Sequence, residues 1–463
     1  RDSSIHATER EGSGAGGVSK DFTVSAQETT FISRNLPAIR QDESYCWCPE
    51  DYKVQVSFDL QGTQFTPNEY KPYSQKWEDV DKQLLKPENT QFGEPLSLPT
   101  PFRPETKQAY NSEMNFEEKI ICAFQVLKKK MAWNGRYQLY SKELEKVIKK
   151  GSGSNADLNF ILISILKDFG LEAYPVVMSR RSSGMLPYNF PSLQKLNTFF
   201  VAIHDINKQK YVFLDSSMDV PAFNILPLEL SVNKARMLSL KEKEEKKWVN
   251  VMALSHNKSF MKIDARIEGN QVKGHRSTVL YGQEAIEYQA NENHKQDNLV
   301  SNPENKVSQK EKLTVTNLKV KKQENDWALI EEEFDFVLQV NRTDNHLYIN
   351  PMLFPQLKSN PFIQTERVLP IEFPYPYKFT MLSTLTLPEG YEVEELPQSQ
   401  SIRSEGDGLQ CKYMIQQQGN TILLNYVFHL KGYIFLSEQY KQLQELWTKV
   451  IEKNNALIVL KKI

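Results

Sequence analysis

One short apolar segment constrains the fold of this chain more than any other feature. Residues 158–166 are apolar at nearly every position, and only Asn159 and Ser164 interrupt them. A helix with this pattern has no polar face to turn toward solvent, so it must be buried on most of its sides. The segment therefore predicts a central helix around which the rest of a domain packs.

Capping residues mark both ends of this predicted helix. Ser154 is followed three residues later by Asp157, a capping-box pattern in which polar side chains satisfy the free N–H groups of the first turn. Gly170 follows the last apolar positions and suits the left-handed backbone that ends many helices. We expect the helix to run between these residues.

Three strand-like segments rich in β-branched and aromatic residues follow the helix, at residues 172–179, 196–203 and 210–215. This order, with these sequences in it, resembles the core of the transglutaminase-like superfamily, which has a papain-like fold. In that family a Cys at the N-terminus of the central helix works with a His on the second strand and an Asp on the third. The helix N-terminus favours the thiolate, the His takes the proton, and the Asp orients the imidazole.

Counting back from Gly170 locates the family's Cys-x-Asp motif in this chain. The Cys position falls on Asn155, and the Asp two residues later falls on Asp157. The family's His falls on Thr198, and the Asp at the end of the third strand falls on Asp215. The resemblance thus implies a triad of which only the Asp remains.

The two replaced residues cannot perform the original chemistry. The amide of Asn155 is no nucleophile, and the hydroxyl of Thr198 is no base at neutral pH. Each position also has an ordinary structural explanation, because Asn155 can cap a helix, Thr198 suits a strand and Asp215 can begin a turn. We therefore predict that these positions carry no catalysis.

No neighbouring residue is an evident substitute for the missing Cys and His. Ser152 and Ser154 flank the nucleophile position, but a serine needs an activating base. The only histidine in the stretch 110–245 is His204, six residues beyond Thr198, which is about 20 Å along an extended strand. His204 therefore cannot simply replace the family's base.

The four cysteines predict neither a disulfide nor a metal site. Cys46 and Cys48 are two apart, which puts both on one face of a strand and makes a bond between them awkward. A zinc site would need two more ligands at suitable spacing, and none is near. Cys122 lies within residues 116–131, where apolar positions recur at helical spacing, as expected of a core residue. We expect unbridged thiols and no metal or cofactor, with a distant pairing as the alternative, and the state of Cys411 stays open.

The resemblance extends over nearly the whole chain, to a branch of bacterial multidomain transglutaminase-like proteins. Within the core it is carried by residues 131–137, 149–154, 179–184 and 214–217. Outside the core it is carried by residues 35–43, 52–58, Trp77, 84–85, 438–443 and 456–461. In that branch the catalytic Cys and His are often replaced, and the outer β-domains have no known function. These proteins are typically exported to the bacterial envelope, which implies a periplasmic or cell-surface location.

We expect an α+β chain of three parts. Residues 1–104 would be the end of an N-terminal β-rich domain of sandwich type, closed by a proline-rich linker at 95–104. Residues 105–245 would form the transglutaminase-like core, a helix packed on an antiparallel sheet. Residues 246–463 would form a mostly β domain of sandwich type with a late helix and a polar loop at 291–312. Its strands are expected at residues 260–267, 312–316, 328–340 and 380–387.

Composition excludes several classes of function. The chain has 57 basic and 58 acidic residues and a formal net charge of −1, so no global field attracts nucleic acid or an anionic membrane. No segment approaches the roughly 18 consecutive apolar residues of a membrane span. Residues 1–20 lack the apolar region of a signal peptide, yet the chain begins in what resembles the middle of a β-domain. We therefore expect the natural protein to extend beyond Arg1.

A proline-rich segment at residues 350–377 allows two interpretations. It holds six prolines and the aromatic residues Phe354, Phe362, Phe373, Tyr375 and Tyr377. The aromatic faces could bind a sugar or an extended peptide. We favour an irregular crossover whose aromatic side chains pack against the sheets, because prolines prevent edge strands from pairing.

Two functions stay open. The preferred hypothesis is a non-catalytic envelope protein whose degenerate core, held between β-domains, binds or scaffolds protein, peptide or glycan and needs only an open cleft. The alternative is a residual or unconventional enzyme of the peptidase or transglutaminase type, acting on peptide amides. It would need a nucleophile and a base near Asn155, and the fold would have to bring His204, His275, His294 or Cys122 there.

Overall fold

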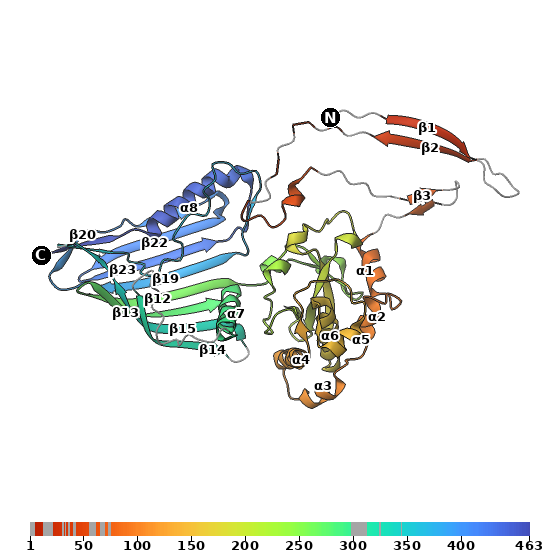
Figure 1. Cartoon of the computed structure of the whole chain (residues 1–463), viewed down its shortest axis with the longest axis horizontal. Helices are drawn as coiled ribbons and strands as arrows, with labels where there is room; N and C mark the ends of the chain where they lie inside the picture. Colours follow the sequence, from red (N-terminus) through yellow and green to blue (C-terminus); the bar gives the residue numbers. More distant parts are fainter. Residues whose placement is uncertain are drawn as a thin grey trace. The chain divides into compact units, whose positions relative to one another are not determined.

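The structure is a computed structural model that describes most of the chain. The described residues are 5–12, 22–29, 32, 34–35, 38–39, 43–54, 62–64, 70–72, 76–297, 313–323, 326–343 and 345–463. The chain divides into two compact units, residues 1–42 and 43–463. In the first unit, β1 (Ile5–Gly12) pairs with β2 (Phe22–Thr29) as an antiparallel ribbon (Figure 1). The three-part division of the chain stays a prediction.

Helix α6 (Asn155–Asp168) is the central helix that the apolar segment predicts. Every residue from 155 to 166 is buried. The capping box is present, because the Ser154 N–H donates to the Asp157 carboxylate at 2.8 Å and the Asp157 N–H donates to Ser154 Oγ at 3.3 Å. Gly170 has φ of 74°, the left-handed conformation that favours glycine. Both predicted ends of the helix are confirmed.

A five-stranded antiparallel sheet packs against α6. Its strand order is β11-β10-β7-β8-β9, with β7 (Glu172–Met178), β8 (Thr198–Asp205), β9 (Lys210–Leu214), β10 (Ala235–Met237) and β11 (Trp248–Val249). The three strands predicted after the helix are confirmed as β7, β8 and β9. Strands β10 and β11 were not predicted, because two or three residues are too few to show a period.

In the described part of the chain, five α-helices precede α6. They are α1 (Trp77–Leu85), α2 (Gly93–Ser97), α3 (Arg103–Ala109), α4 (Phe116–Lys130) and α5 (Leu144–Lys150). The core around α6 draws apolar side chains from α1 to α4 as well as from the sheet. Helix α4 confirms the helical spacing around Cys122.

The segment 95–104, predicted as a linker, is partly helical and contributes side chains to the core. Pro95 and Leu96 are buried in α2, and Phe102 is 9% exposed in the same apolar cluster as α6. The prolines are tolerated because Pro95 and Pro104 stand in the first turns of short helices, where a backbone N–H has no partner within the helix. The linker expected at 95–104 is therefore wrong.

Before residue 95, the described strands form only two ribbons, β1 with β2 and β3 (Gly62–Gln64) with β4 (Tyr70–Pro72).

An eight-stranded sheet dominates the C-terminal part of the second unit. Its order is β14-β15-β13-β12-β19-β23-β22-β21, where β12 is Asn257–Glu268, β13 Gln271–Tyr281, β14 Leu313–Gln323, β15 Asp326–Gln339, β19 Tyr377–Thr386, β21 Gln400–Arg403, β22 Leu409–Gln418 and β23 Thr421–Leu430. Only β12 and β19 run parallel to each other. Buried and exposed residues alternate along β12, so the sheet has one apolar inner face. The four strands predicted here are confirmed as β12, β14, β15 and β19, except for residue 312, which lies outside the described residues.

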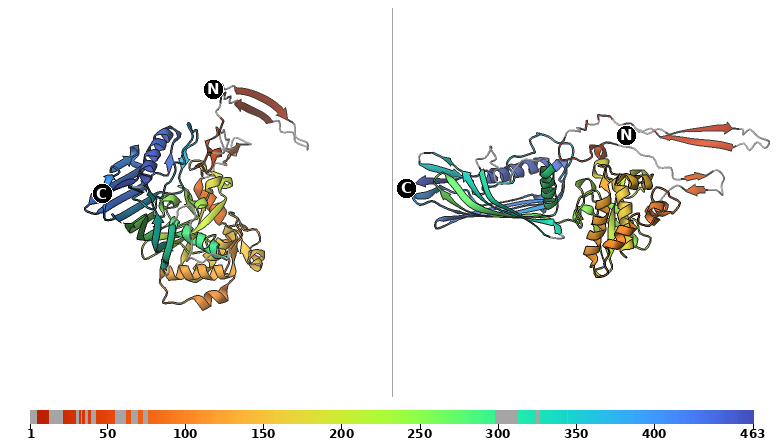
Figure 2. Two further views of the ribbon diagram at one scale, coloured as in Figure 1. Left: turned by 60° about the vertical axis from the view of Figure 1, so that its left-hand side comes forward. Right: turned by 60° about the horizontal axis from the view of Figure 1, so that its bottom comes forward.

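The layer over this inner face is not the second sheet of a β-sandwich. The sheet curves as a half-barrel, and helix α8 (Tyr440–Asn454) lies along its inner face (Figure 2). Beside it is a four-stranded sheet, β16 (Asn341–Arg342), β17 (His346–Ile349), β25 (Ile458–Lys462) and β20 (Tyr391–Glu395). Apolar residues of α8 at helical spacing fill the space that a second large sheet would occupy, and these residues are Tyr440, Leu443, Trp447 and Val450. The predicted β-sandwich is therefore wrong for this part of the chain.

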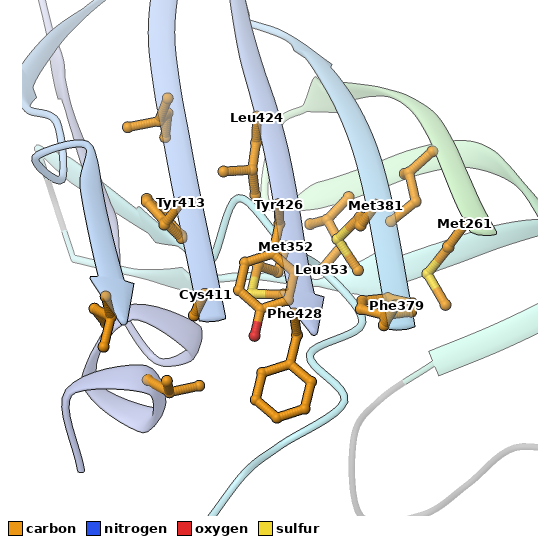
Figure 3. Packing of buried hydrophobic residues seen from close by; sticks show 14 of the residues in the cluster. Met261, Met352, Leu353, Phe379, Met381, Cys411, Tyr413, Leu424, Tyr426 and Phe428 are labelled. Carbon is orange, nitrogen blue, oxygen red and sulfur yellow. The ribbon is translucent and has the colours of Figure 1, made fainter. Parts of the chain in front are cut away.

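The proline-rich segment 350–377 confirms the packing interpretation. Phe362 and Phe373 are 3% and 4% exposed, and both contact Trp447 of α8, at ring-centroid distances of 5.2 Å and 5.5 Å. Met352 and Leu353 pack beneath the strands of the large sheet (Figure 3). The aromatic side chains therefore belong to the core rather than to a ligand platform.

Helix α7 (Gln283–Asp297) covers the other end of the inner face, over β12, β13 and β15. The polar loop predicted at 291–312 is wrong for 291–297, which continue this helix, and the remainder of that loop lies outside the described residues.

Candidate functional site

Asn155, Thr198 and Asp215, the three positions that the resemblance marks as a triad, belong to one hydrogen-bond network at the N-terminal end of α6. Asn155 is the first residue of that helix, and its side-chain N–H groups donate to Thr198 Oγ1 at 2.8 Å and to the Phe199 carbonyl at 3.0 Å. Its side-chain oxygen accepts from the Gln138 N–H at 2.9 Å, and its backbone N–H donates to the Arg136 carbonyl at 3.1 Å. Every polar group of the Asn155 side chain is therefore engaged.

Asn159, one turn further along α6, connects Asn155 to the Asp215 position. Its side-chain N–H groups donate to the Phe199 carbonyl at 2.8 Å and to Asp215 Oδ1 at 3.0 Å, and its oxygen accepts from the Ser216 N–H at 3.0 Å. In the sequence, Asn159 stands out only as an interruption of the apolar segment. The signal was its spacing of four residues from Asn155, which places both amides on one face of the helix.

Asp215 ends this network as a fully buried carboxyl group. Its Oδ2 accepts from Ser217 Oγ at 2.8 Å, and Ser217 Oγ also lies 3.3 Å from the Tyr137 hydroxyl. Burial raises the pKa of Asp215, and the hydrogen bonds from Asn159 and Ser217 act in the opposite direction. Asp215 therefore accepts hydrogen bonds but has no imidazole to orient.

The network is closed to solvent as well as lacking a nucleophile. Asn155 and Thr198 are 0% exposed and Asp215 is 1% exposed. Above them, Tyr137 is covered by the Arg180 guanidinium at 5.9 Å from the ring centroid, and Arg180 pairs with Glu229 at 3.9 Å. The open cleft that the binding hypothesis requires is thus not present at Asn155 itself.

The histidines proposed as substitutes lie elsewhere. In the pairing of β7 with β8, Thr198 is opposite Met178, whereas His204 is opposite Glu172 at the other end. His204 Nδ1 lies 3.3 Å from the Glu172 carboxylate, and its ring stacks on Tyr211.

Two further histidines belong to the C-terminal part of the chain. His275 is on β13, where its Nδ1 lies 2.9 Å from Asp335. The His294 side chain lies outside the described residues. The hydrogen-bond partners given for His204 and His275 are Glu172 and Asp335, which lie outside the Asn155 network.

Cys122 and Ser154 have hydrogen-bond partners outside the Asn155 network. Cys122 Sγ contacts the Ala109 carbonyl at 3.5 Å, and burial raises the pKa of its thiol. Ser154 Oγ donates to the Asp157 carboxylate at 2.7 Å as part of the helix cap, and Ser152 lies in the short strand β6 (Ser152–Gly153). All four cysteines are free, and burial raises the pKa of Cys46 to about 11.

A narrow cavity lies where β7 leaves the sheet. Its volume is about 60 Å³, and Ser179, Arg181 and Met185 are among the residues that line it. This is room for only a few water molecules.

Among the described residues, no group of His, Cys, Asp and Glu side chains could hold a metal ion. None of the helices in the described ranges is long and apolar enough to cross a membrane.

Comparisons with known proteins agree with a mixed α+β fold and leave the chemistry open. A family described as a domain of unknown function with a solved structure, DUF3858, matches residues 345–460, about a quarter of the chain. The crystal structure of a protein of Parabacteroides distasonis ATCC 8503, described as a candidate protease, superimposes with a TM-score of 0.52. The two proteins are 12% identical, and the match covers 99% of this chain and 68% of that one. No curated protein matches the chain significantly. At this identity, the structural similarity shows the fold alone.

Proposed function

We propose that residues 105–245 are a degenerate transglutaminase-like core, and that the chain is a non-catalytic envelope protein that binds or scaffolds other molecules. The observation that carries this proposal is the hydrogen-bonded network of Asn155, Thr198 and Asp215 at the N-terminus of α6. These positions take the place of a thiol, an imidazole and a carboxylate, and only the carboxylate survives. The periplasmic or cell-surface location is part of the proposal and rests on the resemblance.

A direct test of the proposal compares the chain with variants at the same positions. We expect the unmodified protein neither to hydrolyse nor to cross-link peptide amides. Amide hydrolysis or cross-linking that is lost in the Asp215→Asn variant would contradict the proposal and favour the alternative enzyme. That assay is read by the release or incorporation of a labelled amine.

Restoring the missing residues tests the assignment of positions. The double variant Asn155→Cys, Thr198→His places a thiol at a helix N-terminus beside an imidazole, because these two side chains are in hydrogen-bond contact in the structure. We expect the thiol at position 155 to ionise at a lower pH than in the Asn155→Cys single variant, since the histidine favours the thiolate, and the absorbance of the thiolate at about 240 nm, with that of the unmodified protein subtracted, measures this. The same ionisation midpoint in both variants would mean that the two positions do not form a Cys-His pair.

A binding role must use a surface other than the closed network. The loop between β7 and β8 is the candidate, because Met185 and Phe190 there are 56% and 63% exposed although both are large apolar residues. A protein or peptide is the class of partner that suits such side chains, and a glycan is the second class in the proposal. Binding to peptide and glycan arrays should be lost in Phe190→Ser and kept in Leu240→Ser, a matched exposed residue (68%) outside that loop. Equal binding by both variants would remove the loop from the proposal.

A further inference from the structure

A second cavity lies in the C-terminal part of the chain, far in sequence from the triad positions. It opens on the inner face of the large sheet, between β12, β13, β15 and α7, and its volume is about 360 Å³. That volume is within the range of small-molecule sites, which begins at roughly 300 Å³. The polar residues that line it are Ser259, Arg276, Thr278, Glu284, Glu287, Tyr288, Glu332 and Gln356.

Three buried polar atoms at this cavity have no hydrogen-bond partner in the protein. Thr278 is 6% exposed, and its Oγ1 is unpartnered. Arg276 Nε and Glu284 Oε2 are also buried and unpartnered. An unsatisfied buried polar group costs about 1–3 kcal/mol, so three of them at one cavity indicate hydrogen bonds that a bound molecule completes.

The pairing of the strands explains why these side chains converge. Thr278 on β13 is opposite Met261 on β12 and Glu332 on β15. Met261 is buried in the core of the large sheet, so Thr278 and Glu332 share its inner face. Helix α7 packs over that face, and its residue Glu284 lines the cavity.

The charges around the cavity are unbalanced. Arg276 is the one cation among the lining residues, and it pairs with Glu332, which also accepts a hydrogen bond from the Tyr288 hydroxyl at 2.8 Å. Glu284 and Glu287 are left without a cationic partner among the lining residues, and burial raises the pKa of both. Two carboxyl groups beside an apolar surface favour a ligand that carries positive charge.

We propose that this cavity binds a small hydroxylated amine, such as an amino sugar, through its ammonium group. The ammonium donates to Glu284 Oε2 and approaches Glu287, hydroxyl groups of the ligand pair with Thr278 Oγ1 and Arg276 Nε, and the Phe379 ring provides an apolar contact. This site depends on no residue of the triad positions and stands whether or not the core is catalytic.

Binding of two sugars that differ only in the group at C2, an ammonium or a hydroxyl, tests the proposal. Titration calorimetry of the full chain should show binding of D-glucosamine at least about tenfold tighter than that of D-glucose, because only the former carries an ammonium group. Nα-acetyl-lysine methylamide, which has the ammonium but no hydroxyl groups, should bind more weakly than glucosamine. Equal affinity for the two sugars, or no measurable binding of either, overturns the proposal. A lysine derivative that binds as tightly as glucosamine overturns its hydroxyl part.

Variants with matched controls locate the binding. Glu284→Gln should weaken glucosamine binding about tenfold. Glu333→Gln should not change it, because Glu333 is on the outer face of β15 and pairs with Lys319. Thr278→Val, which keeps the size of the side chain, should weaken binding without lowering the melting temperature, since the hydroxyl it removes is unpartnered in the protein. Unchanged affinity in both Glu284→Gln and Thr278→Val would place the ligand elsewhere and overturn the proposal.

Discussion

The buried side-chain amides of Asn155 and Asn159 connect the N-terminal end of α6 to the neighbouring strands by hydrogen bonds. Asn155 and Asn159 together donate to the Phe199 carbonyl, and Asn159 connects the helix to Asp215 and Ser216 at the end of β9. A side-chain amide can both donate and accept, whereas a thiolate can only accept. The assignment of Asn155, Thr198 and Asp215 to triad positions stays a prediction that followed from motif spacing. The role of Asn159 did not, because it depends on which strand atoms face the helix.

At the residue scale we predict that Asn159→Ala is strongly destabilising. The change leaves Asp215 Oδ1 and the Ser216 N–H without the partner they have in the structure, inside a fully buried site. The free energy of unfolding should fall by about 3 kcal/mol, measured by urea denaturation. The control is Asn207→Ala in the exposed turn between β8 and β9, which should change stability by less than about 0.5 kcal/mol. A loss below about 1 kcal/mol for Asn159→Ala would show that the network is not needed for stability.

Single elements differed in how much their sequence could predict. Helix α6 and strands β7 to β9 carry clear periods and caps, and both their type and their order were predicted. Helices α2 and α3 were missed because prolines in 95–104 suggested a linker, although a proline in a first helical turn is tolerated. The half-barrel was missed for a different reason: alternation shows that a sheet has one buried face, but not what covers that face.

At the element scale we predict that Trp447 holds α8 against the large sheet. Its ring contacts Phe373, Phe362 and Phe428, which come from the proline-rich crossover and from β23. Trp447→Ala should lower the free energy of unfolding by about 3–5 kcal/mol, because it leaves a cavity in the core. Lys449→Ala, on the exposed side of the same helix, should be close to neutral. A melting temperature that is equal in the two variants would contradict this role.

Within the second compact unit, the segment 43–54 is in contact with the core and with the C-terminal part. Glu372 accepts from the Trp47 N–H at 2.9 Å and from the Tyr52 hydroxyl at 2.7 Å, and Asp51 accepts from the Met185 N–H at 2.7 Å. These contacts join residues more than a hundred positions apart. They tie the two regions of this unit together.

At the scale of this whole unit, Arg181 is the residue to test. Its guanidinium donates to the carbonyls of Phe373 and Pro374 at 2.7 Å and 2.8 Å and lies over the Trp47 ring at 4.3 Å, and burial lowers its pKa to about 10. Arg181→Ala should uncouple the core from the C-terminal part, so that calorimetry shows two transitions where the unmodified protein shows one. The loss of hydrogen bonds should amount to about 2–3 kcal/mol. Arg103→Ala, an exposed residue at the start of α3, should leave a single transition, and a single transition in both variants would contradict the coupling.

The sequence by itself determined the local elements and which residues stand at the positions that the resemblance marks. The apolar segment can be satisfied only by a buried helix, and the Asn and Thr at positions 155 and 198 supply neither a thiol nor an imidazole. Only the tertiary structure decided how the buried polar groups are satisfied. Asn155 and Asn159 donate hydrogen bonds to Phe199 and Asp215, whereas the atoms Thr278 Oγ1, Arg276 Nε and Glu284 Oε2 have no hydrogen-bond partner beside a cavity. The reason is physical. Periodicity and capping act between near neighbours in the chain, whereas hydrogen bonding and burial depend on residues that meet only when the chain has folded.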